Sequence, residues 1–231
     1  MALILYIETA TGVCSAALAE NDRLISEKHT AESRLHAQLL TVFIDQLMQE
    51  AGYTYHQLDA VCVSKGPGSY TGLRIGVAVA KGLCFGLDKP LLAVNTLFSM
   101  TVCMIEQLAK RNDLIQNELL YVPMIDARRM EVYVAVYDAA LNEISPTQAL
   151  ILNKESFTEY NNRKLIFFGD GAGKLKELID PHINAEFITD FEFSAKGMVN
   201  EGNGRFISRE FENTAYFEPF YLKEFLGHKR V

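Results

Sequence analysis

The sequence predicts an α/β protein built from two similar lobes, each a mixed sheet with helices. Two observations lead to this prediction. The first hundred residues alternate in the order β-β-β-α-β-α-β-α, and the remainder again begins with a strand meander followed by helix, strand and helix. The chain has 231 residues, of which 49% are hydrophobic; this is ample for a real core and allows one large domain or two of roughly 100 residues. We place the lobes at residues 1–110 and 111–231.

Strands joined by tight turns open the chain. Residues 2–9 form an apolar run, residues 13–19 return after a Thr-Gly turn, and residues 23–29 alternate like a strand with one wet face. The three segments together predict an antiparallel meander.

The first long helix is predicted over residues 32–50, and its apolar band is unusually wide. The band includes Leu39, Leu40, Phe43, Ile44 and Leu47. A surface helix with one covered face does not need so wide a band. The helix is therefore expected either to be sandwiched inside the fold or to pack against another protein molecule.

A glycine-rich loop and a helix of small residues follow the apolar strand 60–63. The loop is Gly66-Pro67-Gly68, and in the helix Gly72, Gly76 and Ala80 share one face. A glycine in a helix interior costs about 1 kcal/mol relative to alanine. These glycines therefore indicate close backbone approach, either to a neighbouring element or to a ligand.

The remaining elements follow in order. A strand over 91–94 and a helix over 95–110 complete the first lobe. The second lobe is predicted to contain strands at 119–125, 131–137, 148–152, 165–168 and 185–188, and helices at 155–160, 174–179 and 194–210. The apolar tail segment 217–222 is predicted to dock back on the first lobe.

Composition disfavours several classes of protein. The formal net charge is −7, and phosphate binding needs clustered lysine and arginine, so a stand-alone nucleic-acid binder is disfavoured. The 4 cysteines form no CxxC pair and lie in apolar runs, which indicates buried free thiols in a reducing compartment. Neither a signal-peptide pattern nor an uncharged run of roughly 20 residues is present. A cytoplasmic protein without membrane contact is expected.

Templates for catalytic and metal centres do not fit. The Gly66 loop matches neither GxxxxGK[ST] nor GxGxxG, and Ser69 lies outside a Gly-x-Ser-x-Gly elbow. The first long helix has no HxxxH pair, and the histidines are isolated along the chain. No catalytic residue and no metal ligand is predicted.

Acidic residues at strand ends leave one further interpretation open. Glu8 and Asp126 each follow a buried strand, where a carboxylate can hold Mg²⁺ on a nucleotide or simply cap a turn. The turn Gly169-Asp170-Gly171 could likewise approach a nucleotide or be a plain turn.

Several stretches together resemble the TsaB family. They are ILYIETATGVCSAAL, SRLHAQLL, SKGPGSYTGLRIGVAVAKGL, IDARRMEVYVAVYD and PFYLK, and they extend from Leu3 to Lys223. Glu8 stands where many members have Asp, and Lys223 where many have Arg; both replacements keep the charge. The chain also lacks the paired histidines with which TsaD, a paralogue of TsaB, holds its metal.

The resemblance implies the two-lobed actin-like, sugar-kinase and heat-shock ATPase (ASKHA) fold. It also implies a non-catalytic scaffold that pairs with TsaD in forming N6-threonylcarbamoyladenosine on tRNA. The heterodimer would recruit the ATPase TsaE, the chain alone would form a homodimer through the same surface, and tRNA would contact mainly the partner. The implied docking residues are Leu39, Leu40, Phe43, Ile44, Leu47, Gly72, Gly76 and Ala80.

No cofactor is expected, apart from weak ATP or ADP binding in a vestigial cleft. That cleft would be lined by Glu8, Asp126, Gly169, Asp170 and Gly171. The alternatives are a nucleotide-dependent ATPase or phosphotransferase of the same fold and, with least support, a metallopeptidase-like protein.

Overall fold

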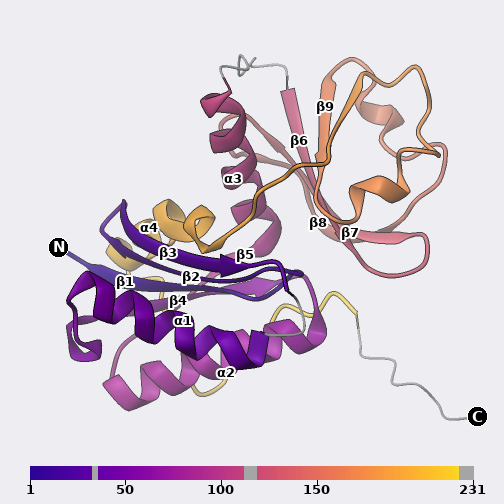
Figure 1. The fold of residues 1–231 in the computed structure, drawn as a ribbon. Coiled ribbons are helices and arrows are strands. Elements are labelled where there is room, and N and C mark those ends of the chain that lie inside the picture. The colour runs from indigo at the N-terminus through magenta and orange to yellow at the C-terminus, as the bar shows by residue number, and fades with distance from the viewer. Residues whose placement is uncertain (33–35, 112–118, 224–231) are drawn as a thin grey trace, which may run out of the picture.

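A computed structural model describes residues 1–32, 36–111 and 119–223, and it contains two lobes, each built on a five-stranded sheet (Figure 1). Residues 33–35, where the helix predicted from residue 32 would begin, lie outside the described residues, as do residues 224–231.

The first sheet has the strand order β3-β2-β1-β4-β5. Its strands are β1 (Leu3–Glu8), β2 (Cys14–Glu20), β3 (Arg23–Thr30), β4 (Ala60–Gly66) and β5 (Leu91–Asn95). The pairs β1–β2 and β2–β3 are antiparallel, whereas β1–β4 and β4–β5 are parallel. The predicted opening meander is therefore confirmed.

The second sheet repeats this topology in the order β10-β9-β6-β7-β8. Its strands are β6 (Leu119–Asp126), β7 (Glu131–Asp138), β8 (Glu143–Ile151), β9 (Lys164–Phe168) and β10 (Ala185–Ile188). Because β6 occupies the place of β1 and β9 that of β4, Asp126 ends the strand that corresponds to the one ended by Glu8. Gly66 and Gly169 likewise lie at the ends of the corresponding strands β4 and β9. Both glycines have a positive φ, +106° at Gly66 and +93° at Gly169. The duplicated order confirms the predicted fold class.

Four α-helices are described, together with short 3-10 helices. The α-helices are α1 (His36–Ala51), α2 (Tyr70–Leu87), α3 (Thr96–Lys110) and α4 (Val199–Ile207). The 3-10 helices are η2 (Tyr55–Gln57), η3 (Thr158–Tyr160), η4 (Ala172–Lys174) and η5 (Ala195–Met198). Helices α1 and α2 lie side by side on one face of the first sheet, and α3 rises beside the second sheet (Figure 1).

Side chains cap two of these helices at their N-termini. The hydroxyl of Ser69 accepts from the backbone N–H of Gly72 at 3.2 Å, and the side chain of Asn95 accepts from Leu97 at 2.8 Å. These bonds satisfy N–H groups that the first turn of a helix leaves without a partner, so they fix where α2 and α3 begin.

The predicted helices of the second lobe differ from the structure. Of residues 155–160, only Thr158–Tyr160 are helical, as the 3-10 helix η3. Residues 174–179 form no α-helix: η4 ends at Lys174 and turns follow. Pro181 disfavours helical backbone at the residue before it, which leaves too few residues for a stable helix. The segment 194–210 divides into η5 and α4, and the strand predicted at 148–152 begins earlier, at Glu143.

The chain from Ala195 onward, assigned above to the second lobe, packs against the first sheet. Ala195, Met198 and Val199 are buried with Ile4 and Tyr6 of β1, on the opposite face from α1 and α2. The Tyr6 hydroxyl donates to the carbonyl of Val199 at 3.1 Å. This face of the sheet is apolar and would be exposed to water without η5 and α4. Its burial explains why the chain returns from the second lobe to the first.

The tail after α4 runs along the first lobe. The Lys81 ammonium donates to the carbonyls of Ala215 and Phe217, both at 3.1 Å, and Phe217 packs against the first-lobe core. Further on, the Phe220 N–H donates to the Lys65 carbonyl at 2.7 Å. Hydrogen bonds thus anchor the tail at both ends of this contact.

All cysteines are free and buried, as predicted. None of the helices in the described ranges combines the length and hydropathy that a bilayer span requires.

Candidate functional site

The inner face of α1 is part of the protein's own core. Leu40 and Leu47 have no exposed surface and Ile44 is 2% exposed, and all three pack in the cluster beneath the first sheet. The assignment of these residues to a docking surface is therefore corrected. The wide apolar band serves a helix that contacts the strands β2 and β3 and also the neighbouring helix α2.

The N-terminal glycines of α2 allow the helix to approach β1 closely. A Cβ on Gly72 would lie 2.0 Å from the carbonyl oxygen of Thr9, and one on Gly76 would lie 2.3 Å from the Thr9 hydroxyl oxygen. That hydroxyl donates to the Gly72 carbonyl at 2.8 Å. Ala80 is also fully buried. The close approach inferred from sequence is thus made within the chain, and these three residues are not available to a partner.

The glycines nearer the C-terminus of α2 face the other way. A Cβ on Gly82 or on Gly86 would have no heavy atom within 4 Å. Phe85, between them, is 88% exposed. The spacing of Gly82, Phe85 and Gly86 places them on the outer side of the helix, together with the exposed Ala78.

The neighbouring helix α1 also carries partly exposed apolar side chains. Val42 is 45% exposed, and Leu39 and Phe43 are half-buried. We call the whole surface the α1/α2 outer face; it comprises Leu39, Val42, Phe43, Ala78, Gly82, Phe85 and Gly86. Leu39 and Phe43 are the two members that the sequence analysis had already named. Small and apolar residues occur all round α2, so the sequence pattern alone could not separate its inner face from its outer one.

Glu8 is a buried carboxyl group at the end of β1. It has no exposed surface, and its Oε1 accepts from the backbone N–H of Ala10 at 2.5 Å. Its Oε2 has no hydrogen-bond partner among the described residues. Burial raises the pKa of Glu8 to about 7, against the opposing effect of the hydrogen bond from Ala10. Near neutral pH the group is therefore poised between its acid form and its carboxylate form.

This shift predicts a pH-dependent stability. Because the folded-state pKa of about 7 lies above the ordinary 4.5, the folded chain binds an extra proton between these values, and the free energy of unfolding falls as pH rises through this window. Glu8→Gln should remove this dependence and stabilise the protein at pH 8 by roughly 3 kcal/mol. Urea denaturation of both proteins from pH 4 to 8 measures the difference. Parallel curves for the two proteins would contradict the assignment.

The other predicted cleft residues come together at the end of β6. The Asp170 carboxylate accepts from the backbone N–H of Asp126 at 2.9 Å, and the Asp126 carboxylate pairs with Lys174 at 2.6 Å. Burial raises the pKa of Asp170. A Cβ on Gly169 would lie 2.3 Å from the Met124 carbonyl oxygen, and one on Gly171 would lie 2.9 Å from the Ile125 carbonyl carbon. These glycines therefore accommodate the chain's own backbone.

The arrangement does not fit a magnesium–nucleotide site. Among the described residues no hydrogen bond or ion pair joins Glu8 to the Asp126 group, and no group of acids, histidines and cysteines could hold a metal ion. Glu8 is fully buried with a pKa raised to about 7, and Asp126 is already neutralised by Lys174. Carboxylates that would hold Mg²⁺ need to be ionised and to converge on one point.

Comparison with known proteins identifies the family. The family model described as TsaD: tRNA N6-adenosine threonylcarbamoyltransferase matches residues 25–199. The tRNA threonylcarbamoyladenosine biosynthesis protein TsaB of Bacillus subtilis is 31% identical over 181 residues, which are 77% of this chain and 75% of that protein. The chain belongs to the TsaB family.

A second TsaB relative agrees with this assignment, and a solved structure agrees with the fold. TsaB of Escherichia coli is 36% identical over 141 residues, covering 61% of this chain and 57% of that protein. The solved structure named YeaZ from Pseudomonas aeruginosa, 24% identical, superposes with a TM-score of 0.80 over 96% of this chain and 100% of its own. It shares the two-lobed fold. The resemblance to TsaB read from the sequence motifs is thus confirmed.

Proposed function

We propose that this TsaB-family protein is a non-catalytic partner of a TsaD-type transferase in forming N6-threonylcarbamoyladenosine on tRNA. The two proteins would dock through the α1/α2 outer face. The curated TsaB relatives are named as tRNA threonylcarbamoyladenosine biosynthesis proteins, and part of this chain matches the TsaD family model. Proteins descended from one ancestor often assemble through the same surface, which suits pairing between TsaB and TsaD.

The observation that carries the docking proposal is the pair of open glycines on α2. Each costs roughly 1 kcal/mol of helix stability relative to alanine, and nothing within the chain approaches either one. A helix of a second protein, packed against Gly82 and Gly86, would make use of that space. Phe85 offers a large aromatic side chain to the same partner, as hot-spot residues do at interfaces.

The proposed non-catalytic role rests on the chemistry of Glu8 and Asp126, the acids at the ends of β1 and β6. Glu8 is buried and its pKa is raised to about 7, and Asp126 is paired with Lys174. Full burial keeps Glu8 from contacting a substrate, and the ion pair with Lys174 neutralises Asp126. The heterodimer is in turn proposed to bind the ATPase TsaE, and the chain alone is proposed to form a homodimer through the outer face.

Mixing the purified protein with TsaD from the same organism tests the proposal. Size-exclusion chromatography with light scattering should show one TsaB–TsaD species at the mass of a heterodimer. Calorimetry with Mg-ATP on the isolated chain addresses the enzymatic alternative. No association with TsaD, or micromolar binding of Mg-ATP, would each contradict the proposed role.

A further inference from the structure

The turn between β6 and β7 carries two adjacent arginines in left-handed backbone. Arg128 and Arg129 have φ of +68° and +48°. The turn is closed by the Glu131 N–H, which donates to the Arg128 carbonyl at 3.2 Å. A residue with a Cβ costs roughly 1–2 kcal/mol in this conformation, which glycine and, to a lesser degree, asparagine adopt more readily. The two arginine side chains are therefore kept here at the expense of backbone stability.

The carboxylates beside this turn are already paired with lysines. Asp126 pairs with Lys174, and Glu131 pairs with Lys223. Both arginine side chains are exposed, and neither forms an ion pair with a described residue. The turn thus presents two positive charges that no described residue pairs with, in a chain whose net charge is −7.

A third arginine, Arg74 of the first lobe, contacts two tyrosines, Tyr70 and Tyr221. The Arg74 guanidinium lies 4.5 Å from the centroid of the Tyr70 ring, and its Nε donates to the Tyr221 hydroxyl at 3.3 Å. The two tyrosine rings lie 5.1 Å apart. Arg74 is exposed, although Glu218 lies within its electrostatic range. Guanidinium groups interleaved with aromatic rings are typical of surfaces that bind nucleic acid.

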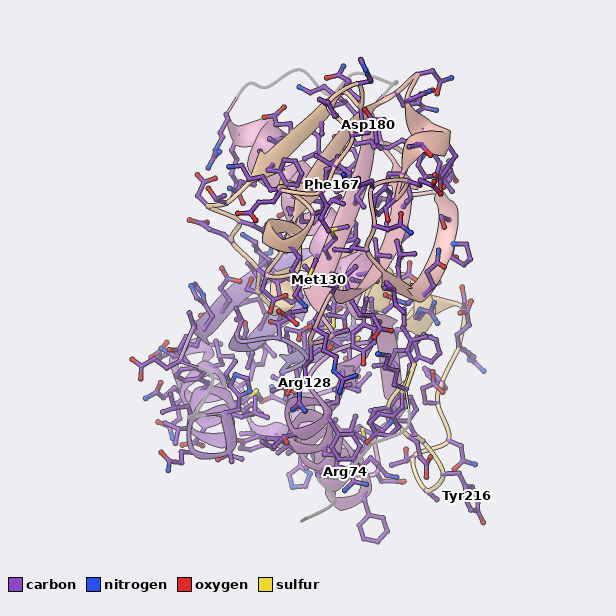
Figure 2. All side chains as sticks on the ribbon, turned by 90° about the vertical axis from the view of Figure 1, so that its right-hand side faces the viewer. Arg74, Arg128, Met130, Phe167, Asp180 and Tyr216 are labelled. Atoms are coloured by element: carbon purple, nitrogen blue, oxygen red, sulfur yellow. The ribbon has the colours of Figure 1, made fainter. Side chains whose placement is uncertain are left out.

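The tail joins these two features into one surface. Tyr221 contacts Arg74 on α2, and two residues later Lys223 pairs with Glu131 at the start of β7. Figure 2 shows Arg128 between Met130 of the second lobe and Arg74 of the first. The surface therefore spans the junction of the lobes. On α2, Arg74 lies one helical turn before Ala78 of the α1/α2 outer face.

We propose that the surface formed by Tyr70, Arg74, Arg128, Arg129 and Tyr221 binds RNA directly. Phosphates would contact the guanidinium groups, and a base would lie against the tyrosine pair. That the RNA is a tRNA rests on the proposed function. From the sequence, tRNA is expected to contact mainly the partner. The proposed surface adjoins the α1/α2 outer face and would share that contact between the two proteins.

A double substitution separates this role from a merely structural one. Arg128→Asn combined with Arg129→Gly places residues that tolerate left-handed backbone at both positions, so the thermal midpoint should stay equal or rise. The matched control, Arg23→Gln with Lys110→Gln, removes two exposed charges far from the turn. Binding is measured by fluorescence anisotropy of a fluorescein-labelled unmodified tRNA, with the protein alone and with its TsaD complex, at several salt concentrations.

The turn variant should bind the tRNA about 10-fold more weakly than wild type, with a salt slope reduced by about 1.4, the value for two lost phosphate contacts on single-stranded RNA. The control variant should match wild type. Equal affinity and equal slope for the turn variant would overturn the proposal. Size-exclusion chromatography with TsaD is run on every variant, so a failure of complex formation is recorded separately from a failure of RNA binding.

Discussion

Gly72→Ala is expected to destabilise the protein by about 3 kcal/mol or more, because the new Cβ would lie 2.0 Å from the Thr9 carbonyl oxygen. Relief would require α2 to move away from β1. Such a movement would disturb the hydrogen bond from the Thr9 hydroxyl to the Gly72 carbonyl and the buried contacts of Leu73 and Val77. The expected readout is a lower midpoint in urea with an unchanged slope.

Gly82→Ala, in the same helix, is the matched control. Its Cβ would meet no atom within 4 Å, so the substitution should stabilise the helix by about 0.5–1 kcal/mol. The two variants carry the same chemical change and should move the free energy of unfolding in opposite directions. A loss of stability in both, or in neither, would refute the distinction between the inner and outer glycines.

The two-lobed fold could be predicted because its signals are local. The strand meanders appear as short apolar or alternating runs between turn residues, and each lobe shows its own sequence of elements. Helix α3 is also marked locally: Asn95 ends β5 and caps the following helix. Segments whose ends have clear turn or capping residues were placed within a few positions of their observed bounds.

Burial, in contrast, depended on segments distant in sequence. Helix α2 is apolar or small at most positions, so periodicity could not indicate which glycines face β1. Glu8 was recognisable as an acid after a strand. Its raised pKa, however, depends on complete burial, to which residues distant in sequence contribute: Ser64 of β4 lies beside the carboxyl group and bonds Thr96 of α3 at 3.2 Å. The placement of α4 on the first sheet likewise follows from a contact with Tyr6, which Gly202 makes possible.

Loss of TsaD binding is expected when the outer face is changed without disturbing the core. Gly82→Arg places a long charged side chain where the partner helix is proposed to lie, and it should abolish the heterodimer. Phe85→Ala removes a side chain that is 88% exposed, so the stability of the monomer should change by less than about 0.5 kcal/mol. The affinity for TsaD should nevertheless fall by about 30-fold, the value for an interface hot spot of about 2 kcal/mol.

The control for both variants is Leu40→Ala, at a position that the sequence analysis had placed in the interface. Leu40 has no exposed surface, and truncation should destabilise the fold by about 2–5 kcal/mol. In the fraction that remains folded, the affinity for TsaD should stay close to wild type, because the side chain never reaches the surface. Isothermal titration with TsaD, together with urea denaturation of each variant, separates the two effects. If the fully folded Phe85→Ala protein binds TsaD as wild type does, the heterodimer forms through another surface.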